Sequence, residues 1–150
     1  AFSTSSSAAT IPVTLKTVTD DLGVKKDVSS FVIPVGATIN MDGTAIMQGL
    51  ATMFIASTAG VDLSTIEYMQ IVLLAMVASI GAAAVPSAGT ITLALILSSL
   101  GLPLDAIGLI LAVDRILDMI RTSVNVTGDS AVACIVANSE NLLDREVFNK

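Results

Sequence analysis

Long apolar stretches, interrupted by small and polar residues, make up most of this 150-residue chain. Their length and apolar character predict helices. Polar loops and turns divide the chain into five parts. These are the end of a helical hairpin with a following helix (residues 1–22), a broken helix (28–60), a second hairpin (64–101), a last helix (105–138) and a polar tail (139–150).

The stretch FVIPVGATINMDGTAIMQGLATMFIASTAG (residues 31–60) is long enough for a bilayer span, which needs roughly 20 residues plus tilt. Pro34, Gly36 and the sequence NMDGT interrupt its centre. Inside a membrane, a helix can lose backbone hydrogen bonds only where protein or a water-filled cavity satisfies the freed groups. We therefore predict a cavity at this break, lined by Asn40 and Asp42.

Two shorter apolar segments, residues 64–81 and 90–101, flank the small-residue turn AAAVPSAG. The second is too short to cross a bilayer at 1.5 Å per residue. The pair therefore predicts a re-entrant hairpin, which enters and leaves the membrane from one side. The hydroxyl-rich start, AFSTSSSAAT, could be the second limb of a similar hairpin, with a short amphipathic helix between Pro12 and Gly23.

Composition favours a membrane environment. Apolar residues make up 53% of the chain, charged residues only 13%, and the mean hydropathy is +0.85, against roughly 25% charged residues in soluble domains. Between Val28 and Val113 there is no Lys or Arg, and the only acids are Asp42, Asp62, Glu67 and Asp105. The predicted fold class is an all-α integral membrane protein with a broken transmembrane helix, re-entrant helical hairpins and a long polar-striped last helix.

Charge and residue content also exclude several functions. The net charge of −6 argues against a nucleic acid partner, because phosphate binding needs clustered Lys and Arg. The chain has no His, and Cys134 is its one cysteine, so it cannot form a zinc cluster, an internal disulfide or a nucleophile–histidine catalytic system. Because Ala1 begins the chain in mid-pattern without Met, we expect a piece of a longer protein.

The last helix carries a polar stripe. At 100° per residue, six polar side chains fall within an arc of about 100° on an otherwise apolar helix. Ionisable groups inside a membrane usually line ion or substrate paths, because placing each one there costs several kcal/mol. The alternatives are a solvent-exposed helix face and structural ion pairs such as Asp118 with Arg121. The stripe consists of Asp114, Asp118, Arg121, Thr122, Asn125 and Asp129.

The residue types indicate what this stripe could bind. Arg121 offers a planar fork that matches a carboxylate, and Asp118 is an acceptor suited to an ammonium group. Asp129, Asp42 and Asn40 carry hard oxygen ligands of the kind that Na⁺ prefers. Broken helices add free carbonyls for cations and free N–H groups for anions. An acidic amino acid is the simplest ligand that has both an amine and a carboxylate side chain.

Four motifs, TSSSAATIP, GATINMDGT, ASIGAAAVPSAGT and DRILDMIRTSVNVTGDS, cover nearly the whole chain. In order and spacing they resemble the glutamate/aspartate transporter family, the dicarboxylate/amino acid:cation symporters. The resemblance implies a secondary active transporter in the cell membrane, with elevator-like movement and a homotrimeric assembly. It implies no enzymatic activity and no cofactor, with Na⁺ as the coupling ion. The chain resembles the C-terminal part of the transport domain, so the N-terminal half of the same chain is expected to be missing here.

Matched position by position, the family pattern implies substrate contacts and sodium ligands. Substrate contacts are expected at Ser5, Ser7, Met41, Thr44, Val85, Gly89, Asp118, Arg121, Thr122 and Asn125, with Asp118 taking the amine and Arg121 the side-chain carboxylate. One sodium site would use carbonyls of Gly36, Asn40 and Asn125 with the Asp129 carboxylate. A second would use carbonyls of Thr38, Ser79, Ile80 and Ala82. A third would use Asp42 and the Asn40 side chain, completed by residues outside this chain.

Single positions separate the branches that the resemblance allows. Arg121 argues against neutral amino acid exchangers, and Asp118 argues against the dicarboxylate branch, whose members carry Ser there. The NMDGT motif and Asp129 favour sodium coupling over a proton-coupled glutamate or C4-dicarboxylate symporter. A channel-like, anion-conducting membrane protein is an alternative of another class, and a soluble phosphate-binding enzyme is disfavoured because GAAAVPSAG lacks a P-loop lysine.

The chain departs from the family pattern at a few positions. Many relatives carry Arg at the position of Ser5 or of Met119, and Gly is common at the positions of Ala84 and Ser87. Potassium counter-transport is therefore left open. A stiffer second hairpin is expected to change the rate of transport and not the class of protein.

Overall fold

A computed structural model describes residues 1–81 and 88–150. Within them the regular secondary structure is helical, apart from an isolated β-bridge between Val24 and Leu143. The helices are α1 (Ser7–Asp20), α2 (Lys26–Ile39), α3 (Asp42–Thr58), α4 (Thr65–Gly81), α5 (Ala88–Ser99), the 3₁₀ helix η1 (Leu104–Ala106), α6 (Ile107–Leu111), α7 (Asp114–Ser139) and α8 (Arg145–Phe148). The predicted all-α class is confirmed for these residues.

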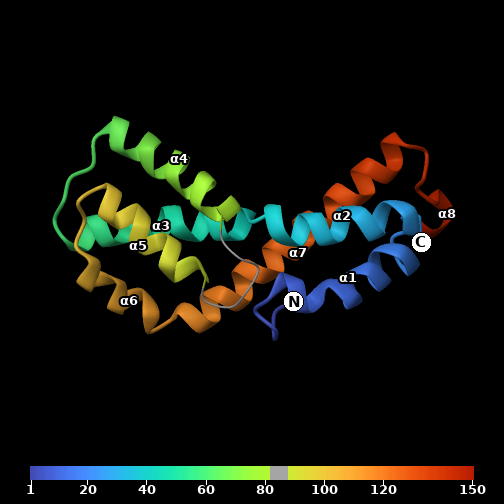
Figure 1. Cartoon of the computed structure of the whole chain (residues 1–150), viewed down its shortest axis with the longest axis horizontal. Helices are drawn as coiled ribbons and strands as arrows, with labels where there is room; N and C mark the ends of the chain where they lie inside the picture. Colours follow the sequence, from blue (N-terminus) through green and yellow to red (C-terminus); the bar gives the residue numbers. More distant parts are fainter. Residues whose placement is uncertain (82–87) are drawn as a thin grey trace.

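The molecule is elongated, with α2 and α3 following one another along its length and α7 packed against both (Figure 1). Two separate apolar cores lie toward its ends. The core beside α3 contains Met47, Ala51, Ile55, Ala56, Leu93, Leu97, Leu102 and Ile110. The core beside α1 and α2 contains Val18, Val24, Val28, Ile33, Ala133 and Ala137. The polar part of α7 lies between these cores, where it meets the break between α2 and α3.

The break in the second predicted segment is narrower than the sequence indicates. Only Asn40 and Met41 separate α2 from α3, whereas Pro34 and Gly36 lie inside α2. Pro34 lacks the N–H that would continue the helical ladder. Burial of Ile33 and Ala37 nevertheless holds this part of α2 helical, because both side chains face the interior of the molecule. Asn40 leaves the helix with an extended backbone conformation.

The first helix begins before Pro12 instead of after it. Ser6 caps α1, and its hydroxyl accepts a hydrogen bond from the backbone N–H of Ala9 at 3.2 Å. The hydroxyls of Thr10 and Thr14 donate to carbonyls one turn earlier in the chain, which satisfies them although both residues are buried. The hydroxyl-rich start is therefore helical from Ser7 onward.

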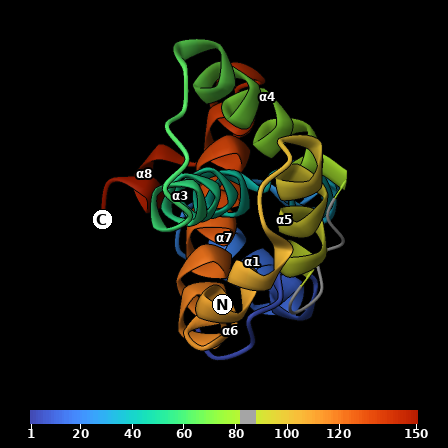
Figure 2. The same cartoon turned by 90° about the vertical axis from the view of Figure 1, so that its left-hand side faces the viewer.

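The predicted hairpin of residues 64–101 consists of α4 and α5, which run in opposite directions (Figure 1). Both pack on α3, and Figure 2 shows them on the same side of it. Ser64 and Glu67 form a capping box at the start of α4, with the Glu67 carboxylate accepting from the Ser64 backbone N–H at 2.7 Å. The tip of the hairpin lies outside the described residues.

The segment predicted as one last helix, residues 105–138, is divided into η1, α6 and α7. The chain bends at Val113, where φ is −118° and ψ is 0°. Before this bend, α6 buries Ile110 in the core beside α3. None of the helices in residues 1–81 and 88–150 has both the length and the apolar content that crossing a membrane requires.

The C-terminal segment, predicted as a polar tail, is attached to the turn between α1 and α2. The backbone N–H of Lys25 donates to the Leu142 carbonyl at 3.1 Å, and that of Asp144 donates to the Gly23 carbonyl at 2.8 Å. These bonds flank the isolated bridge, and α8 follows them at the end of the chain (Figure 1). Leu142 and Leu143 of this segment pack against the apolar core beside α1 and α2.

Candidate functional site

The polar stripe of α7 is buried. All six of its side chains are at most 6% exposed, and they lie on the face of α7 that meets α2 and α3. A solvent-exposed helix face is therefore the wrong interpretation. The alternative of a structural ion pair is realised in part, because Arg121 and Asp118 form a buried salt bridge one turn apart.

Asn125 joins α7 to the first turn of α3. Its side-chain oxygen accepts a hydrogen bond from the backbone N–H of Gly43 at 2.8 Å, and its amide nitrogen donates to the Thr44 hydroxyl at 3.3 Å and the Met41 sulfur at 3.4 Å. The first N–H groups of a helix have no partner inside the helix. Met41, at the N-cap of α3, provides no side-chain cap. Asn125, on another helix, thus supplies the hydrogen-bond acceptor for the start of α3 that the N-cap residue does not provide.

Asn40 joins the helix break to Asp129. Its side-chain amide donates to the Asp129 carboxylate at 3.0 Å and to the backbone carbonyl of Asn125 at 3.3 Å. Asp129 is only 1% exposed. The break therefore gathers one buried carboxylate with amide and carbonyl oxygens, which is a donor set suited to a hard monovalent cation.

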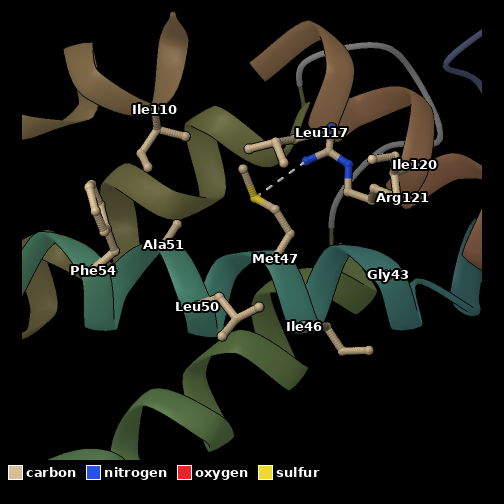
Figure 3. Close-up of a pocket in the computed structure, with 10 residues that line it drawn as sticks. All are labelled: Gly43, Ile46, Met47, Leu50, Ala51, Phe54, Ile110, Leu117, Ile120 and Arg121. Atoms are coloured by element: carbon tan, nitrogen blue, oxygen red, sulfur yellow. Dashed lines mark hydrogen bonds between the residues drawn. The ribbon is translucent and has the colours of Figure 1, made fainter. Parts of the chain in front are cut away.

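The guanidinium of Arg121 lies between Asp118 and the first turn of α5. It packs so closely against Gly89 that a Cβ atom added there would overlap it. On its other side, it borders an apolar groove of about 310 Å³ between α3, α6 and α7. Figure 3 shows this groove, with one guanidinium nitrogen directed at the Met47 sulfur at 4.0 Å. Arg121 is thus held where polar and apolar surroundings meet.

The structure brings together most of the predicted site residues on α2, α3, α5 and α7. Those in mutual contact are Asn40, Met41, Thr44, Asn125 and Asp129 in one group and Gly89, Asp118 and Arg121 in the other. Gly36 adjoins the first group, since a Cβ atom added to it would lie 2.5 Å from an Asp129 carboxylate oxygen. Thr122 is buried on the same face of α7.

The remaining predicted residues are more dispersed. Ser5 and Ser7 are buried at the start of α1, and Ser5 has a left-handed backbone with φ of 49°. Strain of this kind persists only where the surroundings enforce it. Asp42 is exposed and borders a groove together with Phe2 and Gly128.

The described residues of the expected second sodium site lie on α2 and α4. The Thr38 hydroxyl donates to the Pro34 carbonyl, the Ser79 hydroxyl donates to the Met76 carbonyl, and the Ile80 side chain is exposed. That expectation concerns their backbone carbonyls, and it stays a prediction. Ala82 and Val85 lie outside the described residues.

Two polar contacts between helices were missed by the sequence analysis. Gln48 on α3 is fully buried and donates to the Thr92 hydroxyl on α5. Thr90 on α5 donates to Asp114 on α7 at 3.4 Å. A polar amide inside the apolar run of residues 45–56 was the available signal for the first contact. No sequence pattern within α5 or α7 alone indicates the contact between Thr90 and Asp114.

Comparison with known proteins places this site in a family. Residues 1–139 match the sodium:dicarboxylate symporter family. The chain therefore belongs to that family, which is a class of transporters and not of enzymes.

Several relatives are called excitatory amino acid transporters. The chain is 54% identical to excitatory amino acid transporter 2 of Mus musculus over 136 residues, which is 91% of this chain and 24% of that protein. It is 52% identical to an excitatory amino acid transporter of Caenorhabditis elegans over 91% of this chain and 27% of that protein. It is 49% identical to excitatory amino acid transporter 1 of Homo sapiens over 100% of this chain and 27% of that protein. The chain thus spans about a quarter of the length of the curated relatives it matches.

Proposed function

We propose that this chain is the C-terminal part of the transport domain of a sodium-coupled symporter for acidic amino acids. The observation that carries the proposal is the buried Asp118–Arg121 pair, which lies on the same helix face as the amide-lined break between α2 and α3. The names of the relatives support acidic amino acids as the substrate class, and the family supports coupling to sodium.

The pair explains how an acidic amino acid could be selected. Breaking a buried ion pair is costly unless each charge gains a new partner. The amine of glutamate or aspartate can replace Arg121 beside Asp118, while the side-chain carboxylate can replace Asp118 beside Arg121. A neutral amino acid supplies only the first replacement and leaves the guanidinium without its partner. The substrate therefore needs both charges, which is the condition for selectivity.

The surroundings of Asp129 support a cation site. Its hydrogen-bond donor is the neutral amide of Asn40, and a buried carboxylate with a neutral partner is costly unless a cation compensates its charge. The carbonyls of Gly36, Asn40 and Asn125 would complete the shell of Na⁺. A proton on Asp129 is the competing way to neutralise it, and it corresponds to the proton-coupled alternative.

Exposed apolar side chains support placement in a bilayer. Soluble proteins rarely expose large contiguous apolar patches. In this chain α4 exposes Ile66, Met69, Val72, Leu73, Met76, Val77 and Ile80. We therefore propose a multi-pass protein of the cell membrane. From the family and the length of the relatives, we further propose re-entrant hairpins, a homotrimeric assembly and further N-terminal helices in the same polypeptide.

Uptake by the full-length transporter in reconstituted vesicles tests the proposal. Wild-type protein should accumulate labelled aspartate or glutamate only with an inward sodium gradient. Arg121→Cys should reduce aspartate uptake by roughly 100-fold, as expected when a buried charged contact worth about 3 kcal/mol is lost. It should still allow uptake of a neutral amino acid such as serine. Arg115→Cys is the matched control, because Arg115 is exposed on the same helix.

Each alternative has its own result in this assay. Unchanged aspartate uptake by Arg121→Cys would refute the role of that residue. Uptake that follows a proton gradient without sodium would support the proton-coupled alternative. A steady current without saturable uptake would support the channel-like alternative.

A further inference from the structure

The first turn of α5 covers the Arg121 side chain. Gly89 lies against the guanidinium, and Arg121 is only 5% exposed. A residue with a side chain could not approach so closely, so the cover consists of bare backbone. The position of this turn therefore decides how much room a ligand has beside Arg121.

A side-chain hydrogen bond ties this turn to α7. The Thr90 hydroxyl donates to one carboxylate oxygen of Asp114 at 3.4 Å. Asp114 is 6% exposed, and its other carboxylate oxygen has no hydrogen-bond partner among the described residues. Burial of a carboxylate is costly unless hydrogen bonds compensate its charge. Losing the bond from Thr90 would therefore leave the Asp114 carboxylate less well compensated.

The geometry of the stripe links this contact to the site. Asp114 precedes Asp118 by one helical turn and shares its buried face of α7. Thr90 directly follows Gly89 in the chain. A bond from Thr90 to Asp114 therefore fixes where Gly89 sits along α7 relative to the ion pair.

We propose that Thr90 and Asp114 are positioning residues for the acidic amino acid site. The pair holds the first turn of α5 against α7, so that the Gly89 backbone is placed over Arg121. Neither residue is assigned a contact with the substrate, and the inference rests on the proposed function. Loss of the pair should weaken substrate binding more than it slows the transport cycle, because the interaction acts on placement of the binding surface.

Substrate kinetics of the full-length transporter in vesicles test this inference. Thr90→Val, which removes the hydroxyl at nearly constant volume, should raise the KM for aspartate about tenfold, the lower end of what loss of a hydrogen bond to a charged group costs. The maximal rate should change less than about twofold. Thr90→Ser, which keeps the hydroxyl, should restore a nearly normal KM. Thr58→Val is the matched control, because Thr58 is exposed at the end of α3.

A double-substitution cycle separates positioning from general packing. In an Asp114→Asn background, Thr90→Val should raise the KM by less than half of its factor in the wild type. An unchanged KM in Thr90→Val, no rescue by Thr90→Ser, or an equal factor in both backgrounds would each overturn the inference. Failure of the proposed function would be seen separately, as absence of acidic amino acid uptake by the wild type.

Discussion

Substitution of Gly43 by alanine should distort the site through the backbone. Gly43 lies in the first turn of α3, where a Cβ atom would be 2.5 Å from the carbonyl oxygen of Arg121 and 3.1 Å from its Cα and carbonyl carbon. Ordinary contact begins at 3.4 Å, so α3 and α7 would have to separate by about 0.9 Å at this point. Both sides of the contact are main chain, and no rotamer change can relieve it.

The cost of this substitution has two parts. Overpacking of a well-packed contact costs about 1–3 kcal/mol. Separation of the helices would also break the 2.8 Å bond from the Gly43 N–H to Asn125, and an unsatisfied buried amide costs about 1–3 kcal/mol more. We expect a destabilisation of about 2–6 kcal/mol. If about 2 kcal/mol of it falls on the substrate-bound state, substrate affinity drops roughly 30-fold.

Thermal unfolding and substrate titration of the purified full-length transporter measure these effects. Gly43→Ala should lower the Tm and weaken aspartate binding. Gly49→Ala is the control, since Gly49 lies in the same helix and a Cβ atom there meets nothing within 4 Å. Its Tm should rise slightly, because alanine is favoured over glycine in a helix by about 0.5–1 kcal/mol. Identical behaviour of the two variants would refute the close-contact argument.

Two further glycine substitutions test other contacts. Gly36→Ala places a Cβ atom 2.5 Å from an Asp129 carboxylate oxygen. It should therefore raise the sodium concentration for half-maximal uptake by about tenfold. Gly108→Ala is the control, because its Cβ atom meets nothing within 4 Å, and it should leave this concentration unchanged. An unaltered sodium dependence in Gly36→Ala would contradict this role of the contact. Gly23→Ala should lower the Tm strongly, since Gly23 has a φ of 71° and a backbone carbonyl of the C-terminal segment 2.5 Å from its Cβ position. Gly60→Ala, with a φ of 69° and open space, should cost only the backbone strain of about 1–2 kcal/mol, so equal Tm losses would argue against the close contact.

Helical periodicity was sufficient to predict the polar face of α7. The residues of the stripe recur at three- and four-residue intervals, which is a property of one helix and needs no partner. The NMDGT interruption likewise located the break, because Asn40 and Met41 separate α2 from α3. Pro12 and Pro34 misled the prediction of where helices begin and break, since both lie inside helices whose neighbouring residues, such as Thr10 and Ile33, are buried.

Pairs that join different helices could not be predicted from these patterns. The contacts Asn125–Gly43, Asn40–Asp129 and Thr90–Asp114 connect residues 24 to 89 positions apart in the chain. Local propensity does not encode such pairs, because they depend on how the helices are placed after folding. The close approach of Gly89 to Arg121 is a further example.

The chain by itself determined which side chains share one face of the last helix and where the long apolar segment breaks, because both follow from the fixed geometry of a helix. The tertiary structure alone decided that this face is buried, that Asp118 pairs with Arg121, and that Asn125 caps α3. The physical reason is that burial and pairing of charges depend on the distances between helices, which are set by packing of the two apolar cores on either side of the site.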